Sequence, residues 1–175
     1  RYGYARALLR DHQLTEAEQQ VKRLRTSHPD TLQFIVLQSR IQVEQGKLAQ
    51  AIGTLEEKGS SFALNYPYHI ILSEAYLRAG RSRQAYELLQ KLDRLRPENT
   101  RVQRLLAQAA ADVGKKALSH EHLAEYYQLM GAPKNAMLQI KIALRTTGLS
   151  NYDEARLESK LRRLQKEVDE LEKKK

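Results

Sequence analysis

The densest group of side chains that could ligate a metal is His120, Glu121, His122 and Glu125. Imidazole and carboxylate groups are the usual zinc ligands, and a helix offers two histidines to one ion when they are four residues apart. Position 124 is an alanine, and on a helix the side chains of His120 and His122 point about 200° apart. We therefore predict no metal site here and expect these histidines to be surface residues.

No other spacing in the sequence matches a catalytic motif. His12, His28 and His69 are isolated, and the sequence has no phosphate-binding loop, nucleophile elbow or paired-carboxylate pattern. It also has no cysteine, which excludes disulfides and thiol chemistry but leaves the cellular compartment undecided. We predict that this chain is not an enzyme and has no cofactor of its own.

The chain is basic, with 30 Lys and Arg against 21 Asp and Glu and a net charge of +9. These charges are interspersed, and the one dense basic run is Lys173 to Lys175. Because no aromatic-interleaved basic motif is present, we expect a surface that attracts acidic partners and no specific nucleic-acid binding. Filter binding at near-physiological salt separates the two, since purely electrostatic affinity vanishes there. No apolar run approaches the roughly 20 residues of a membrane span.

Small residues recur at a fixed interval of 34 residues. The three series are Ala17, Ala51 and Ala85; Ala5, Ser39, Ser73 and Ala107; and Gly46, Gly80 and Gly114. Alanine or serine allows two helices to cross closely, and glycine ends a helix at low cost because it adopts left-handed backbone. The interval is typical of the tetratricopeptide repeat, a pair of packed helices.

This resemblance implies an all-α, right-handed solenoid of about four and a half helix pairs. We predict helices at about 1–11, 14–27, 31–45, 48–58, 67–79, 82–95, 99–113, 116–130, 133–146 and 151–173. A looser connection and a bend are expected at Gly59, Ser60 and Ser61, before Pro67 opens the next helix.

The repeats are expected to occupy residues 1–150. After Gly114 the interval is halved, because Gly131 follows 17 residues later, so we interpret the helix around Leu123 as shared by two repeats. The predicted repeats are approximately 1–29, 30–65, 66–97, 98–131 and 117–148. The chain begins at Arg1 within a helical pattern, from which we expect a fragment of a longer protein.

Residues 151–175 predict one long, charged helix that caps the last repeat. Its apolar residues alternate by four and three positions, as in a narrow seam. They are Leu157, Leu161, Leu164, Val168 and Leu171. Dimerisation through this seam is the alternative, although fewer than three full heptads favour a monomer.

A narrower resemblance comes from three segments. They are Asn65-Tyr-Pro followed by Leu72-Ser-Glu-Ala-Tyr-Leu-Arg-Ala-Gly80, Leu149-Ser-Asn-Tyr-Asp-Glu-Ala-Arg156, and Leu161-Arg-Arg-Leu-Gln165. Together with the halved interval, they resemble the C-terminal repeat region of the periplasmic M48 zinc metallopeptidases that enhance outer-membrane β-barrel assembly. The resemblance implies a periplasmic, non-catalytic recognition half. Its partners would be the protease domain, the barrel-assembly machinery and its substrates. The HExxH zinc helix of that family is absent from this chain.

In tetratricopeptide repeats the first helix of each pair lines a concave face that binds polypeptides. The residues at the corresponding positions mix arginine with aliphatic and polar side chains, which suits carboxylates and backbone carbonyls of an extended or helical ligand. The predicted binding residues are Tyr2, Arg6, Arg10, Gln33, Arg40, Glu44, Ile70, Glu74, Arg78, Arg101, Arg104 and Gln108. Two alternatives remain open, a stand-alone bacterial adaptor and, less favoured, a helical repeat that binds nucleic acid.

Overall fold

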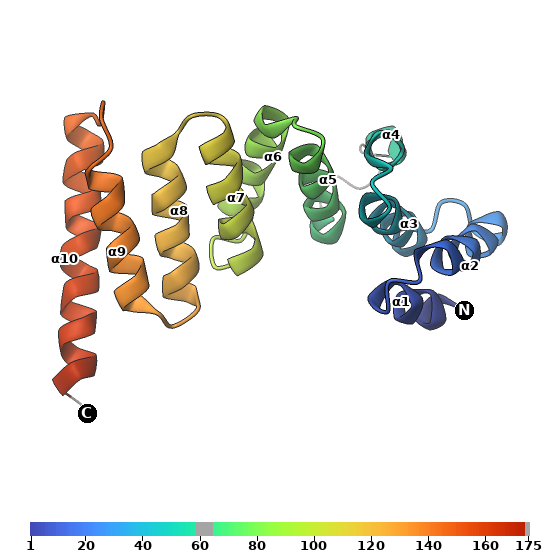
Figure 1. Cartoon of the computed structure of the whole chain (residues 1–175), viewed down its shortest axis with the longest axis horizontal. Coiled ribbons are helices and arrows are strands. Elements are labelled where there is room, and N and C mark those ends of the chain that lie inside the picture. Colours follow the sequence, from blue (N-terminus) through green and yellow to red (C-terminus); the bar gives the residue numbers. More distant parts are fainter. Residues whose placement is uncertain (59–64, 174–175) are drawn as a thin grey trace. The chain divides into compact units, whose positions relative to one another are not determined.

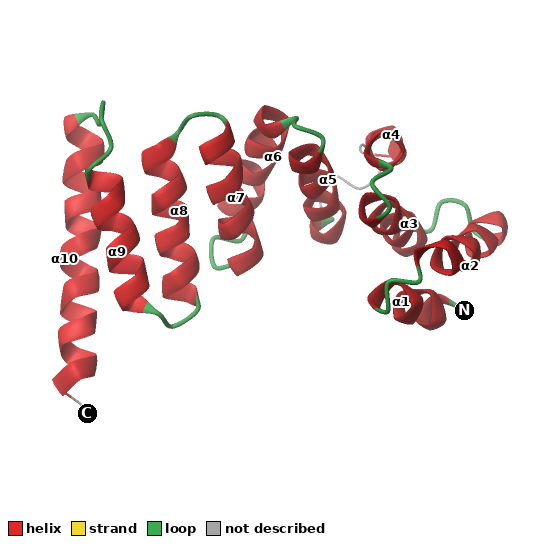
Figure 2. Ribbon diagram, viewed as in Figure 1, coloured by secondary structure: helices red, strands yellow, loops and turns green. Residues whose placement is uncertain are grey.

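A computed structural model describes residues 1–58 and 65–173, and these form helices joined by short turns (Figures 1 and 2). The ten helices of this described part are α1 (Tyr2–Arg10), α2 (Leu14–Ser27), α3 (Leu32–Glu44), α4 (Leu48–Lys58), α5 (Tyr66–Arg78), α6 (Ser82–Leu95), α7 (Thr100–Asp112), α8 (Lys116–Leu129), α9 (Pro133–Leu144) and α10 (Asn151–Lys173). The predicted all-α fold is confirmed, with each helix end within about two residues of its expected place. The expected bend at Gly59, Ser60 and Ser61 lies outside the described residues.

The chain forms two compact units, Arg1–Ala85 and Tyr86–Lys175, and the division falls inside α6. The predicted division into repeats over residues 1–150 and a capping helix over 151–175 describes another kind of boundary and stays a prediction. Among the helices of residues 1–58 and 65–173, none combines the length and the hydropathy that a membrane span requires.

In the first unit, each helix from α1 to α5 packs against the next along the chain. The first helices of successive pairs also meet, since α1 lies beside α3 and α3 beside α5. The first-unit members of the two alanine and serine series are buried in this packing, and Ala5, Ser39, Ala17 and Ala51 are 0% exposed. Larger side chains such as Ile41 fill the remaining core. The small residues therefore do what the repeat register predicts.

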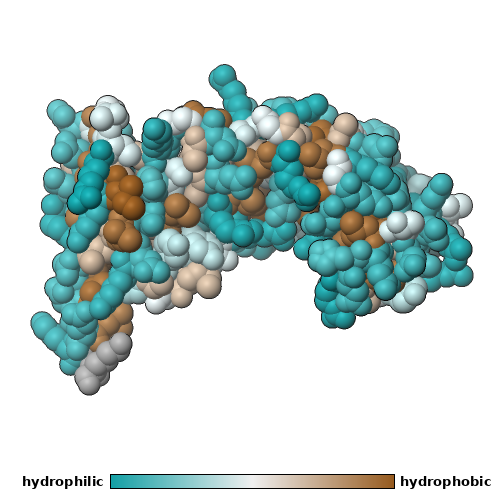
Figure 3. All heavy atoms as spheres, in the orientation of Figure 1, coloured by the Kyte–Doolittle hydropathy of each residue, from teal (hydrophilic) through white to brown (hydrophobic). Residues whose placement is uncertain are grey.

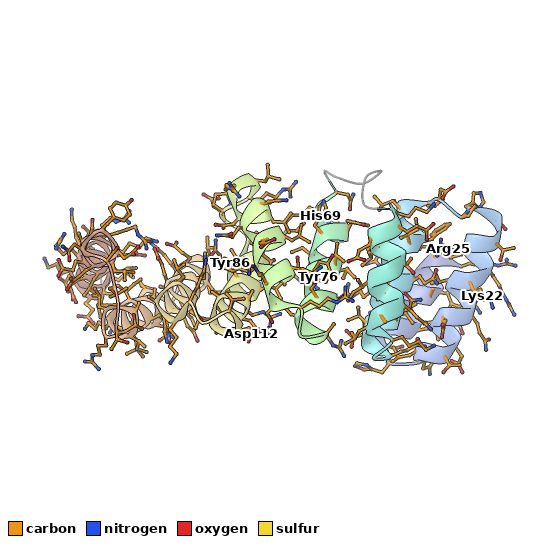
Figure 4. All side chains as sticks on the ribbon, turned by 90° about the horizontal axis from the view of Figure 1, so that it is seen from above. Lys22, Arg25, His69, Tyr76, Tyr86 and Asp112 are labelled. Carbon is orange, nitrogen blue, oxygen red and sulfur yellow. The ribbon has the colours of Figure 1, made fainter. Side chains whose placement is uncertain are left out.

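Polar contacts add to this packing between α4 and α5. The hydroxyl of Tyr68, which is fully buried, donates to the Leu55 carbonyl oxygen. Tyr76 (Figure 4) donates to Glu56 Oε1 at 2.7 Å, and its burial together with the Glu56 carboxylate raises the pKa of the Tyr76 hydroxyl. Both tyrosines thus join the two helices that flank the segment 59–64.

In the second unit, α7 packs on α8, α8 on α9, and α9 on α10. Leu157, Leu164 and Val168 of α10 are buried, whereas Leu171 near its end is 47% exposed. The apolar seam of α10 is therefore used within the chain, as expected of a capping helix. Hydrophilic side chains cover most of the face drawn in Figure 3, and hydrophobic ones form scattered patches on it.

The turn that follows the first helix of each pair needs left-handed backbone. At Gly46, φ is +76°, and the amide of Lys47 donates to the Gln42 carbonyl oxygen at 2.8 Å. The first turn has the same hydrogen bond, from Gln13 to Leu8 at 2.9 Å, but His12 holds the glycine place with φ of 56°. A side chain is strained in this conformation by about 1–2 kcal/mol.

The residue after this turn repeatedly contacts the helix before it. Lys47 pairs with Glu18 of α2 at 2.9 Å, and in the second unit Lys115 Nζ lies 4.5 Å from the centroid of the Tyr86 ring of α6. Both pairs span 29 residues, which follows from the repeat interval. In these two places the contact links a helix pair to the helix before it within a unit.

Candidate functional site

Eight of the twelve predicted binding residues are exposed, which a ligand-binding side chain requires. They are Arg6, Arg10, Gln33, Arg40, Glu44, Arg78, Arg104 and Gln108. Tyr2, Glu74 and Arg101 are half-buried. Ile70 is 2% exposed and belongs to the core, so its side chain cannot contact a ligand.

Four of the exposed residues meet in one groove of the first unit, which we call the α1–α3 groove. Arg6 and Arg10 come from successive turns of α1, and Arg40 and Glu44 come from successive turns of α3. On a helix, residues four apart lie on the same face, so each helix presents two side chains to the groove. The groove has a volume of about 530 Å³.

The lining of the α1–α3 groove is partly apolar. Leu9, which is half-buried, and Leu37, which is 5% exposed, contribute aliphatic surface between the arginines. His12, the residue in left-handed conformation, also lines the groove at the end of α1. His12 and Leu37 were not predicted to line the groove, because neither falls on a repeat position that is expected to face inward.

The arginines of the groove have few competing partners among the described residues. Arg40 has no ion pair there, and Arg10 pairs with Asp11 at 3.4 Å where both side chains are exposed. Arg6 is placed over the Tyr2 ring, 5.9 Å from its centroid, a weak cation–π contact at an exposed site. A carboxylate of a ligand could therefore bind these arginines without breaking a strong ion pair.

Glu44 is the acidic residue of the groove, and it pairs with Arg78 of α5 at 3.7 Å. Both side chains are more than 40% exposed, so this ion pair contributes at most about 1 kcal/mol. Arg78 thus adds a further guanidinium near the groove. Breaking its ion pair with Glu44 in order to bind a ligand carboxylate costs little free energy.

The remaining predicted residues do not join the groove. The Tyr2 ring packs against Phe34 at a centroid distance of 5.7 Å and belongs to the edge of the core cluster. Arg101, Arg104 and Gln108 are on α7, in the second unit. Gln33 is exposed at the start of α3.

The histidines of the metal-like cluster are not ordinary surface residues, which corrects that expectation. His120 Nδ1 is hydrogen-bonded to Gln139 Oε1 at 2.9 Å, and His122 Nδ1 to Gln103 Oε1 at 2.8 Å. Both rings are half-buried, and burial lowers the pKa of His122. The two rings thus bond to different helices, and the described residues contain no group of three metal-ligating side chains.

Glu121 has a structural role that the sequence did not reveal. Its side chain is 5% exposed on α8, and its Oε1 accepts hydrogen bonds from Arg156 and, at 2.5 Å, from Lys160, both on α10. Burial alone would raise the pKa of Glu121, but the two cations outweigh this effect and lower the pKa below its ordinary value. This cluster fastens α10 to α8.

The comparisons with known proteins agree with this architecture. Residues 42–109 match the family model described as Tetratricopeptide repeat. This segment therefore carries tetratricopeptide repeats. No match was found among curated proteins.

Similar solved structures cover most of the chain. One is a thermophilic TPR protein of Thermus thermophilus, TTC0263, with 19% identity over 90% of this chain and 95% of that one and a TM-score of 0.61. Another is MamA, residues 41 to the end, from Desulfovibrio magneticus RS-1, with 12% identity, coverage of 94% and 90%, and a TM-score of 0.69. A tetratricopeptide repeat protein from Parabacteroides merdae ATCC 43184 has 15% identity, coverage of 97% and 76%, and a TM-score of 0.55. At these identities the likeness shows the fold, which is that of tetratricopeptide-repeat solenoids.

Proposed function

We propose that this chain is a protein-interaction module that binds a polypeptide in the α1–α3 groove. Tetratricopeptide repeats suggest this general role, and the observation that carries it here is the convergence of Arg6, Arg10 and Arg40 on one groove. Guanidinium groups bind carboxylates or backbone carbonyls in bidentate fashion, while the half-buried Leu9 offers apolar surface to the aliphatic side chains of the ligand. The ligand that suits this lining is an acidic segment with interspersed aliphatic residues.

The proposal is tested by fluorescence anisotropy with a labelled peptide of alternating Glu and Leu at near-physiological salt. The double variant Arg6→Glu, Arg40→Glu places two carboxylates in the groove, and we expect at least about tenfold weaker binding because charge-assisted hydrogen bonds contribute roughly 1.5–3 kcal/mol each. Circular dichroism should remain unchanged, because both side chains are exposed.

The matched control is Lys22→Glu, Arg23→Glu on α2, where both side chains are exposed and outside the groove (Figure 4 labels Lys22). It changes the net charge by the same amount. Equal loss of binding in the two double variants would mean that only overall charge matters, and the groove would lose its role. Unchanged peptide binding by the variant Arg6→Glu, Arg40→Glu would likewise show that the groove is not the binding site.

A finer assignment concerns the parent protein. We infer that this chain is the non-catalytic recognition half of a periplasmic M48 metallopeptidase that acts in outer-membrane β-barrel assembly and quality control. Support comes from the resemblance of residues 65–67, 72–80, 149–156 and 161–165 to that family's repeat region. Any zinc would belong to the HExxH helix of the protease domain, and none of the residues here is assigned to it.

Mixing the purified chain with a separately expressed M48 protease domain of this family tests the finer assignment. Co-elution in size-exclusion chromatography supports it. Independent elution, together with retained binding of the Glu-Leu peptide, would favour the alternative of a stand-alone bacterial adaptor. Salt-resistant binding to single-stranded nucleic acid in a filter assay would instead favour the nucleic-acid alternative.

A further inference from the structure

The second unit contains a basic pocket that no predicted binding residue occupies. The turn between α7 and α8 forms one side, and the connection between α9 and α10 forms the other. Its volume is about 630 Å³. Lys115, Lys116, Arg145 and Arg156 line it, and Asp153 supplies the one carboxylate among its lining residues. We call this site the α8–α10 pocket.

Two of the four cations already have partners. Arg156 donates to Asp153 Oδ1 at 2.8 Å and also bonds to Glu121, and Lys115 Nζ contacts the Tyr86 ring (labelled in Figure 4). These contacts hold Arg156 and Lys115 in place and neutralise Asp153, so the pocket keeps an excess of positive charge.

The other two cations are unpaired within the described part of the chain. Lys116 and Arg145 are both exposed and have no ion pair there. They come from the start of α8 and the end of α9, so the chain brings them to one pocket from positions 29 residues apart. Cationic groups gathered without acidic partners repel one another, and an anionic ligand removes this cost.

We propose that the α8–α10 pocket binds the carboxylates of an acidic polypeptide segment, as a site separate from the α1–α3 groove. The volume falls within the usual range of ligand sites, and a single small anion would fill a minor part of it. Leu118 and Leu149, both half-buried, add apolar surface that suits a peptide. The guanidinium of Arg145 presents the planar donor pair that matches a carboxylate.

The test is an amide chemical-shift titration of the full chain with an oligoglutamate peptide at near-physiological salt. We expect concentration-dependent shifts at residues 114–118 and 145–149, which line the pocket. In the variant Lys116→Glu, Arg145→Glu these shifts should disappear or require at least about tenfold more peptide. Shifts along α1 and α3 should remain, since they report on the other unit.

The control variant is Lys22→Glu, Lys141→Glu, which alters net charge equally at two exposed residues outside the pocket. It should keep the shifts at residues 114–118 and 145–149. Absence of these shifts in the native chain, or their equal loss in the control, would overturn the proposal. So would shifts that inorganic phosphate produces and the peptide does not, because the ligand would then be a small phosphate. If the native chain shows shifts at residues 114–118 and 145–149 but none along α1 and α3, the result counts against peptide binding in the α1–α3 groove. The α8–α10 pocket would still be supported as a binding site.

Discussion

Replacing Glu121 by glutamine should loosen the capping helix α10. The carboxylate of Glu121 is 5% exposed and binds both Arg156 and Lys160, so the neutral amide removes the charge that compensates two half-buried cations. Removing one partner of a buried ion pair costs about 3–5 kcal/mol. Here Arg156 keeps Asp153 at 2.8 Å and Lys160 keeps Glu125 at 2.7 Å, so we expect a smaller loss of about 2–3 kcal/mol.

Hydrogen exchange measured by mass spectrometry provides the assay, because it reports the opening of α10 separately from the rest of the chain. In Glu121→Gln, peptides within 151–173 should exchange roughly 30- to 150-fold faster, which corresponds to the expected loss at about 1.4 kcal/mol per factor of ten. Peptides from α1 to α3, in the first unit, should keep their native rates.

Glu125→Gln is the matched control for this change. Glu125 also accepts from Lys160, but its side chain is 37% exposed, and an exposed pair contributes at most about 1 kcal/mol. Its effect on α10 should therefore be several-fold at most. Unchanged exchange in Glu121→Gln, or equal acceleration in both variants, would refute the idea that the buried carboxylate fastens α10.

Three further predictions concern the left-handed turns, the pH dependence of stability and the buried alanine positions. His12→Gly should raise the free energy of unfolding of the first unit by about 0.5–1 kcal/mol in urea denaturation, because glycine relieves the left-handed strain, whereas Gly46→Ala should lower it by about 1 kcal/mol; equal signs would contradict this. Burial lowers the folded-state pKa of His122, so the folded second unit favours the neutral ring. The resulting stabilisation is fully present above the unfolded pKa of about 6.5 and should be lost as the pH falls through the lower folded pKa. If the free energy of unfolding of a His122→Gln variant has the same pH dependence between 7 and about 5, His122 is not the source. Ala51→Leu should lower the free energy of unfolding of the first unit by about 1–3 kcal/mol, measured by thermal unfolding, because Ala51 is 0% exposed. An unchanged stability would mean that a larger side chain fits at this position.

The helices were predictable because local signals mark their ends. The prediction of 82–95 matches α6, and that of 116–130 matches α8 to within one residue, since a glycine precedes each by two positions. The same register also contains the unusual turn at His12, which lies 34 residues before Gly46. The periodic glycines thus mark where helices end, and the periodic alanines and serines mark buried positions.

Contacts between distant helices were not predictable in this way. Glu121 meets Arg156 and Lys160 across 35 and 39 residues, and no local spacing indicates that these side chains meet. Ile70 was placed on a binding face because the position rule assumes one buried side per helix. Helix α5 is buried on more than one side, as the run from Tyr68 to Leu72 with a single half-buried residue, His69, shows.

Four residues that line the α1–α3 groove could be predicted from the sequence, but a contact beside it could not. Arg6, Arg10, Arg40 and Glu44 follow from the repeat register, and the structure brings these four together. The pairing of Glu44 with Arg78 depends on how α3 and α5 pack, so only the structure shows it.

The most direct test of the central claim uses the Glu-Leu peptide with a nitroxide spin label and records paramagnetic broadening of the chain's amide signals. If the peptide lies in the α1–α3 groove, broadening is strongest along Gly3–Arg10 and Leu37–Glu44, the two stretches that line it. Broadening concentrated on α2 and α4, with α1 and α3 unaffected, would contradict this claim.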